Sequence, residues 1–147
     1  MDSRALQVLL IQHEGDRPNA YDDATAKTLV TGDTLRGNLT IGVGHNLSAK
    51  GLSPAIRQVL LEEDIEEVED ALDERLPWWR NLSDNRQMAL ADMCFNMGIG
   101  GLLGFPKFLA ALKAGENETA AQELKTSLWA LQVKQRAIDI ENLILGG

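Results

Sequence analysis

The feature that most constrains the fold of this chain is a change of residue pattern near position 50. Residues 21–45 are rich in Thr, Val and Leu and contain the turn sequences Thr31-Gly32-Asp33 and Arg36-Gly37-Asn38. This combination predicts a small antiparallel sheet with tight turns. From Ser53-Pro54 onward the apolar residues follow helical spacing. We therefore predict an α+β protein, because strands and helices are segregated along the chain.

The helices are predicted from apolar spacing and from start and stop signals. The first covers residues 3–13, with Asp2 or Ser3 as its cap and one buried face. That face carries Leu6, Leu9, Leu10 and His13. Residues 84–98 are apolar nearly all round, which is typical of a central core helix. The other predicted helices cover residues 54–76, 106–115, about 117–128 and about 133–144.

These elements predict a single domain over residues 1–147. Its small N-terminal lobe covers about residues 12–53, and a connecting helix covers about 54–76. A mainly helical lobe covers about 77–147 and includes the first helix. A polymer substrate would lie in a cleft between two such lobes.

Composition excludes several classes of function. A net charge of −8 argues against nucleic-acid binding, which relies on Lys and Arg to neutralise phosphates. Much of the excess lies in residues 62–74, which we expect to be exposed on one helix. One cysteine, Cys94, allows no internal disulfide, and with only two histidines a transition-metal centre is not expected. We expect no cofactor.

The N-terminal segment has no basic region before its apolar residues, so it reads as an amphipathic helix and not as a secretion signal. No run of about 18 apolar residues is present, which argues against a membrane-spanning segment. These two observations predict synthesis in the cytoplasm without a signal peptide or an anchor.

Two carboxylates and a hydroxyl near the N-terminus are the candidates for chemistry. Hydrolysis of a glycosidic bond needs a protonated acid and an ionised carboxylate. Glu14 ends the first helix, where unpaired carbonyls favour its protonated form. Asp23 lies in a turn, where we expect it to stay ionised. Asp22 is the competitor, because an Asp-Asp pair in a turn is often only an Asx-turn. Thr40 lies in a predicted strand, and its hydroxyl is a candidate only because of the Gly-rich sequence around it.

Four segments resemble the phage-type lysozymes, the muramidase family that includes the lysozymes of T-even phages. They read HEGDRPNAYDD (13–23), LTIGVGHNL (39–47), FNMGIGGLLGF (95–105) and SLWALQVKQRA (127–137). The resemblance implies a lysozyme-like fold, in which a lobe of one helix plus a β-hairpin is joined by a long helix to a helical lobe. It also implies that Glu14 is the acid, Asp23 the second catalytic carboxylate and Thr40 a water-positioning hydroxyl. The reaction would be an inverting single displacement.

The resemblance extends to residues outside the N-terminal lobe. It implies that Phe95 and Asn96 line the substrate cleft and that Arg136 approaches the catalytic glutamate. His45 would form a structural pair with Asp64 and take no part in catalysis. One departure is a longer insert at residues 24–39, which we expect to enlarge the hairpin.

The resemblance predicts a phage endolysin, a lysozyme (N-acetylmuramidase) that cleaves the β-1,4 bond between N-acetylmuramic acid and N-acetylglucosamine in peptidoglycan. It would lyse the host cell wall as a monomer, acting in the periplasm or wall after a holin-type protein permeabilises the membrane. Nucleic-acid binding and stable membrane insertion are not expected. The alternatives are a lytic transglycosylase, which needs only the glutamate, and a non-catalytic peptidoglycan-binding module on the same scaffold.

Overall fold

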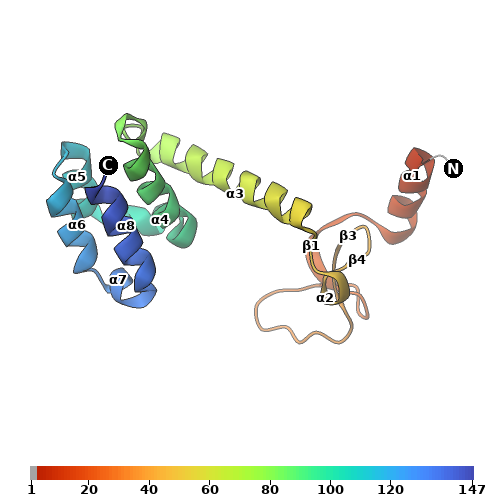
Figure 1. Cartoon of the computed structure of the whole chain (residues 1–147). Coiled ribbons are helices and arrows are strands. Elements are labelled where there is room, and N and C mark those ends of the chain that lie inside the picture. The colour runs from red at the N-terminus through yellow and green to blue at the C-terminus, as the bar shows by residue number, and fades with distance from the viewer. Residues whose placement is uncertain (1–2) are drawn as a thin grey trace. The chain divides into compact units, whose positions relative to one another are not determined.

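The computed structural model describes residues 3–147, so Asp2, one of the two predicted caps of the first helix, lies outside it. The described residues form eight α-helices, a short 3-10 helix and a four-stranded antiparallel sheet (Figure 1), which confirms the α+β class. The chain divides into two compact units, one ending at Arg57 and the other covering Gln58–Gly147. The assignment of the first helix to the helical lobe stays a prediction.

The first unit contains helix α1 (Ser3–Glu14) and a sheet with strand order β2-β1-β3-β4. The first strand starts before the predicted β region, and Pro18 lies within it. The pairing of β1 with β3 is irregular between Arg17 and Tyr21. Proline is tolerated at such an irregularity because it has no N–H to donate to the ladder. The strands are β1 (Arg17–Asp22), β2 (Lys27–Thr28), β3 (Leu39–Gly42) and β4 (His45–Asn46), followed by helix α2 (Leu47–Lys50).

The buried face predicted for α1 is not formed within the first unit. Its Leu6, Leu9 and Leu10 side chains are all more than a third exposed, and no residue of the helix is buried. The strands of this unit are two to six residues long, so the sheet has little apolar surface with which to cover a helix. Hydrogen bonds within its loops stabilise this unit instead, and the same hydrogen bonds position the candidate site.

The second unit begins within α3 (Pro54–Arg75) and is helical throughout. The predicted end of the core helix at Gly98 is confirmed, since this glycine has a φ of 73° and non-helical backbone angles at a kink where two helices of α4 meet. One difference from the predicted helices has a local cause. The segment predicted as one helix over 117–128 is interrupted at Ser127, whose hydroxyl accepts from the backbone N–H of Ala130 and caps a new helix. The elements after α3 are η1 (Trp79–Asn81), α4 (Asp84–Leu103), α5 (Pro106–Ala114), α6 (Asn117–Lys125), α7 (Leu128–Val133) and α8 (Gln135–Leu145).

The hydrophobic core of the described residues lies in the second unit. It is built where α5 packs on α6 and where α8 packs on α4 and α6. Its fully buried large side chains are Leu72, Leu90, Met93, Leu102, Phe108, Leu112, Leu124, Ile140 and Ile144. The prediction that α4 is central to the core is confirmed.

Replacing Leu124 by Ala should destabilise the second unit by about 2–5 kcal/mol, because the side chain is fully buried and its loss leaves a cavity. All three tryptophans lie in this unit, so their fluorescence during urea unfolding reports its stability. Leu131 is 72% exposed and provides the control. Leu131→Ala should change stability by no more than about 0.5 kcal/mol. Equal losses in the two variants would contradict the assigned core.

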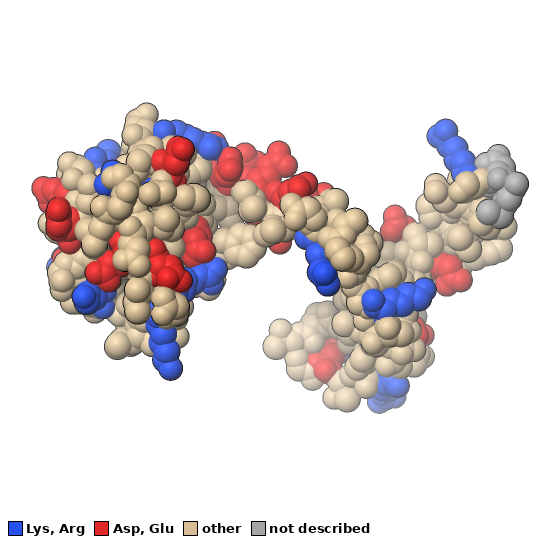
Figure 2. All heavy atoms as spheres, viewed as in Figure 1, with Lys and Arg blue, Asp and Glu red and all other residues tan. Residues whose placement is uncertain are grey.

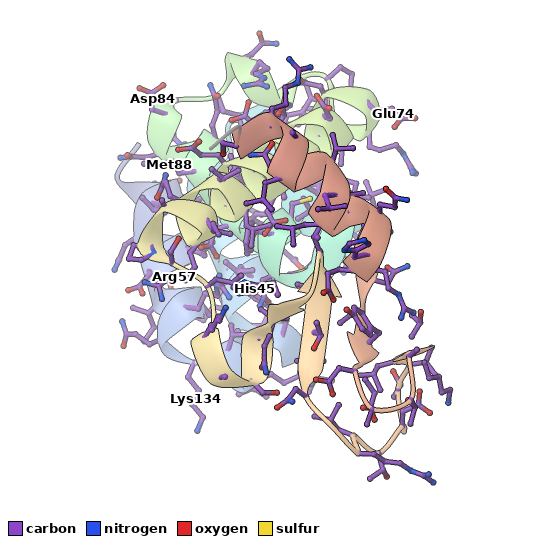
Figure 3. All side chains as sticks on the ribbon, turned by 90° about the vertical axis from the view of Figure 1, so that its right-hand side faces the viewer. His45, Arg57, Glu74, Asp84, Met88 and Lys134 are labelled. Atoms are coloured by element: carbon purple, nitrogen blue, oxygen red, sulfur yellow. The ribbon has the colours of Figure 1, made fainter. Side chains whose placement is uncertain are left out.

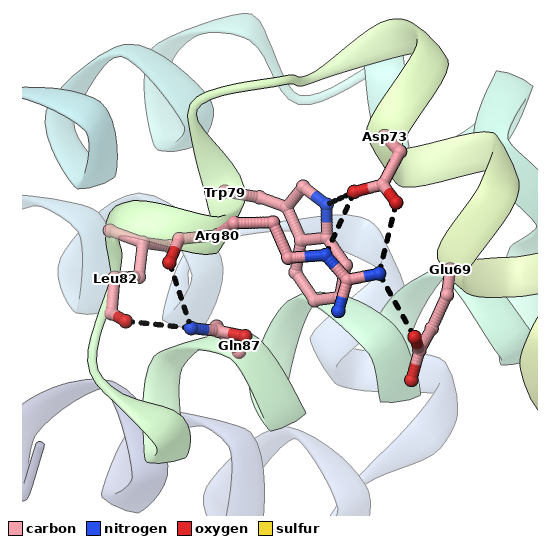
Figure 4. Close-up of polar contacts among 6 residues, drawn as sticks. All are labelled: Glu69, Asp73, Trp79, Arg80, Leu82 and Gln87. Atoms are coloured by element: carbon pink, nitrogen blue, oxygen red, sulfur yellow. Dashed lines mark hydrogen bonds and ion pairs between the residues drawn. The ribbon is translucent and has the colours of Figure 1, made fainter.

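A polar network connects the end of α3 to the segment before α4 (Figure 4). Arg80 donates to both carboxylate oxygens of Asp73, each at 2.9 Å, and to Glu69 at 2.9 Å. The indole N–H of Trp79 donates to Asp73 at 2.6 Å. Hydrogen bonds from Arg80 and then from Trp79 hold the pKa of Asp73 below its usual value. The hydrogen bonds to the Asp73 carboxylate therefore contribute fully to stability above the ordinary aspartate pKa. This contribution is lost as pH falls through the lowered Asp73 pKa.

Acidic side chains gather along α3 (Figure 2). The run over residues 62–74 holds nine Asp and Glu residues, and all of them except Glu69 are exposed. The predicted exposure of this segment is therefore confirmed.

Among the described residues, no single helix is long and apolar enough to cross a membrane. Helices α4 and α5 pass that test of length and composition only when taken together, and they are bent by 107° where they meet.

Candidate active site

Asp23 directly follows β1 and is held by one residue, Asn38, which directly precedes the neighbouring strand β3. The backbone N–H of Asn38 donates to Oδ1 of Asp23 at 2.6 Å, and its side-chain Nδ2 donates to Oδ2 at 2.9 Å. These two hydrogen bonds lower the pKa of Asp23, while partial burial and the charge of Asp22 oppose them. The Asp23 carboxyl is thus both ionised and exposed, as expected for a carboxylate that acts on water.

Asp22 is only 2% exposed, and its carboxylate is occupied by the backbone of its own loop. Oδ1 accepts from the N–H groups of Ala24 at 3.0 Å and Gly37 at 2.9 Å, and Oδ2 accepts from the N–H of Arg36 at 2.7 Å. The first of these bonds forms an Asx-turn. The Arg36 N–H is the main cause of a lowered Asp22 pKa. This geometry gives Asp22 a structural role and leaves Asp23 as the accessible carboxylate.

Thr40 lies in β3, and its side chain is nearly inaccessible at 3% exposure. Its hydroxyl donates to the backbone carbonyl of Asn38 at 3.2 Å. In the antiparallel pairing, Thr40 lies opposite Tyr21, and Leu39 lies opposite Asp22. Because directly opposite residues project from the same face, Thr40 shares a face with Tyr21, while Asp22 projects from the other face.

Glu14 reaches the same sheet from the end of α1. A Cβ added to Gly44 would lie 3.3 Å from the Glu14 Oε2 atom, so the carboxyl packs against this glycine. Gly44 follows β3 and has a φ of 66°, a conformation that L side chains rarely adopt. A glycine is therefore favoured at this turn for two reasons, the positive φ and the close approach of the Glu14 carboxyl. The Glu14 side chain is exposed within the first unit.

His45 lies on β4 (Figure 3), where its Nε2–H donates to the carbonyl of Gly51 at 2.7 Å. The structure therefore gives it a hydrogen-bond partner at the end of α2. Asp64, the predicted partner, lies on α3 beyond the boundary of the first unit. The pairing of His45 with Asp64 stays a prediction.

The three predicted substrate-binding residues all belong to the second unit. Phe95 is 45% exposed and lines a groove of about 450 Å³ together with Arg136 and Met88. Arg136 donates through Nε to Asp92 at 2.7 Å. Asn96 has a different environment, since its Oδ1 accepts from the indole N–H of Trp129 at 2.9 Å. Their roles in substrate binding, and the approach of Arg136 to Glu14, stay predictions.

The insert at residues 24–39 builds the outer edge of the sheet. It contains β2, which pairs with β1, and the Lys27 ammonium lies 2.7 Å from Asp33. Arg17 on β1 spans this region by donating to the carbonyl of Ala26 and to the hydroxyl of Thr28. The insert encloses a hollow of about 250 Å³, with Lys27 and Arg36 among its lining residues. The insert thus adds β2 and a long following loop to the sheet.

Two residues that the sequence analysis did not single out position the candidate carboxylate. Asn38 holds both oxygens of Asp23. Gly37 has no room for a side chain, because an added Cβ would lie 2.8 Å from the Ala24 backbone nitrogen and would overlap the Asp23 carboxylate. The sequence pattern predicts a turn at Arg36-Gly37-Asn38. The contacts of this turn with residues 22–24 depend on strand register, which the pattern alone does not reveal.

The part of the chain that the structure describes holds no second centre of nucleophilic or metal-binding side chains. Across residues 3–147, no group of three or more His, Cys, Asp or Glu side chains is arranged to hold a metal ion. Cys94 is buried in the core, and this burial raises the pKa of its thiol. A buried, protonated thiol is a structural residue.

Comparisons with known proteins agree with the resemblance seen in the sequence. A family model described as Phage lysozyme matches residues 11–139. "Pre-baseplate central spike protein Gp5" of Enterobacteria phage T4 is 42% identical over 71 residues, which cover 48% of this chain and 12% of that protein. "Probable T4-type lysozyme 2" of Dictyostelium discoideum is 28% identical over 164 residues, which cover 90% of this chain and 89% of that protein. "Probable T4-type lysozyme 1" of the same organism is 32% identical over 69 residues, which cover 47% of this chain and 41% of that protein.

Proposed function

Because the chain belongs to the phage lysozyme family, we propose that it is a lysozyme that hydrolyses the glycan strands of peptidoglycan. The bond cleaved is the β-1,4 linkage between N-acetylmuramic acid and N-acetylglucosamine. The observation that carries this proposal is the state of Asp23, an exposed carboxylate whose ionised form is stabilised by two hydrogen bonds from Asn38. A hydrolase needs such a group in addition to an acid, whereas a transglycosylase does not.

In the proposed reaction, Glu14 donates a proton to the leaving glycosidic oxygen as the bond from that oxygen to the anomeric carbon breaks. A water attacks the anomeric carbon from the opposite face, and Asp23 takes its proton. Thr40 holds the same water. The products are two shorter glycan chains, one with a new hydroxyl and one with a new reducing end, so one water is consumed for each bond.

The inverting course is part of the proposal. Glu14 contacts the turn after β3, and Asp23 is bound by Asn38 just before β3. The two carboxyls are thus held at opposite ends of β3, and an inverting enzyme needs room for a water between its two carboxyls. An inverting enzyme would first release the α anomer, which proton NMR of fresh products detects.

We further propose that the protein acts as an endolysin. It would be a monomer made in the host cytoplasm, and it would reach the periplasm or wall only after a holin-type protein permeabilises the membrane. Phe95, Asn96 and Arg136 would contact the substrate, and His45 with Asp64 would be structural.

Mass spectrometry of fragments released from purified peptidoglycan tests the reaction itself. We expect fragments that end in a hydrated, reducing muramic acid. Fragments lighter by one water, with 1,6-anhydro ends, would instead identify a lytic transglycosylase. Protein that sediments with the wall without releasing fragments would identify a non-catalytic binding module.

A further inference from the structure

We infer that Asn38 is a positioning residue that couples the two groups proposed to act on the water, Asp23 and Thr40. This inference rests on the proposed function. It goes beyond it by assigning a role to a side chain in the turn just before β3, a residue that is exposed and has no part in the hydrophobic core.

Four hydrogen bonds converge on Asn38. Its backbone and side-chain N–H groups donate to the two oxygens of Asp23 at 2.6 and 2.9 Å. Its carbonyl accepts from the backbone N–H of Asp23 at 3.1 Å and from the hydroxyl of Thr40 at 3.2 Å. One residue therefore fixes the position of the Asp23 carboxylate and the direction of the Thr40 hydroxyl hydrogen.

The chemical consequence follows from counting hydrogens and lone pairs. Thr40 gives its only hydroxyl hydrogen to Asn38, so its lone pairs remain to accept a hydrogen from water. Asp23 is ionised and accepts the other hydrogen of that water. A water that donates to both groups has its own lone pairs free, and these can be directed toward an anomeric carbon. Asn38 thus makes both partners acceptors, as a water-activating site requires.

The electrostatic consequence concerns Asp23. The two N–H groups of Asn38 are the strongest influences that lower its pKa, and the Ala24 N–H acts in the same direction. The charge of Asp22 acts in the opposite direction. Asn38→Ala removes the side-chain donor, and Asn38→Asp replaces it with a carboxylate of the same shape. Both should raise the pKa of Asp23, and the second should raise it more because it adds a like charge.

The experiment measures the Asp23 carboxyl pKa by 13C NMR and the pH dependence of kcat/KM in the wild type, Asn38→Ala and Asn38→Asp. We expect the acid limb of the profile to move to higher pH together with the Asp23 pKa, in the order wild type, Ala, Asp. At optimal pH, kcat should fall by roughly 10- to 100-fold with little change in KM, because the water-binding groups lose their alignment. A residue that mattered only for shape would tolerate Asn38→Asp.

The matched control is Ser48→Ala. The Ser48 hydroxyl accepts from the backbone N–H of Leu39 at 2.9 Å, so this variant removes a hydrogen bond from the same strand without touching Asp23. It should leave the acid limb in place. If it moves the limb as far as Asn38→Ala does, the effect reflects the strand and the inference is wrong.

Failure of the inference is distinguishable from failure of the proposed function. An unchanged Asp23 pKa and unchanged acid limb in both Asn38 variants would overturn the positioning role, while an inactive Asp23→Asn variant would leave the proposed function standing. If the Asp23 pKa rises and the acid limb does not follow, Asp23 is not the group that activates water. That result would overturn both the assignment of Asp23 and the inference built on it.

Discussion

Glu14→Gln should abolish hydrolysis of peptidoglycan and leave the fold intact. The amide has the shape of the carboxylic acid but no proton to give to the leaving glycosidic oxygen, so general acid catalysis is lost. A positioned acid contributes roughly 10²–10⁴-fold, which sets the smallest decrease in rate that we expect. The side chain is exposed within the first unit, so the substitution removes no core packing. The measurement is the rate of fragment release from purified peptidoglycan.

Asp16→Asn is the matched control for this variant. Asp16 is also an exposed carboxylate, in the segment between α1 and β1, so its substitution makes the same change of charge. We expect wild-type activity from it. Near-normal hydrolysis by a folded Glu14→Gln protein would remove Glu14 from the mechanism. Wall binding retained by the inactive variant would separate substrate recognition from chemistry.

The fold class and most helices were predictable because apolar spacing and terminal signals act locally. Pro106 and Gly115 bracket α5 as predicted, and Gly115 has the left-handed conformation of a helix end. Gly98 has non-helical backbone angles at the predicted end of the core helix. The break at Ser127 was missed because it depends on a local cap, in which the Ser127 hydroxyl accepts from the N–H of Ala130. The buried face predicted for α1 is not formed within the first unit, and its burial against the helical lobe stays a prediction.

The site was predictable only in part, for a related reason. The sequence placed Asp22 and Asp23 side by side, and the choice of Asp23 over its competitor Asp22 rested on the family resemblance. What separates them is strand alternation and register, which bury the first against the Arg36 and Gly37 N–H groups and leave the second exposed. These contacts are 14 and 15 residues apart in the chain. A pattern of single residues does not encode that pairing.

Two amide variants therefore separate these neighbours experimentally. Asp23→Asn should lower hydrolysis by roughly 10²–10⁴-fold, because the neutral amide does not take a proton from water. Its loop should stay ordered, since Asp22 still binds the N–H groups of Ala24, Arg36 and Gly37. Amide hydrogen exchange followed by NMR should show wild-type protection at these three positions, with a change confined to Asn38.

Asp22→Asn should produce the opposite pattern. Three N–H donors converge on the Asp22 carboxylate, and an amide of the same shape offers only one oxygen, so at least one donor loses its acceptor. We expect faster exchange at Ala24, Arg36 and Gly37, and lower activity as a consequence of a loosened loop. High activity in Asp23→Asn, with activity lost in an Asp22→Asn protein whose loop keeps its protection, would transfer the catalytic role to Asp22. The two aspartates differ because the Asp22 carboxylate accepts from three backbone N–H groups, whereas the Asp23 carboxylate is exposed to water.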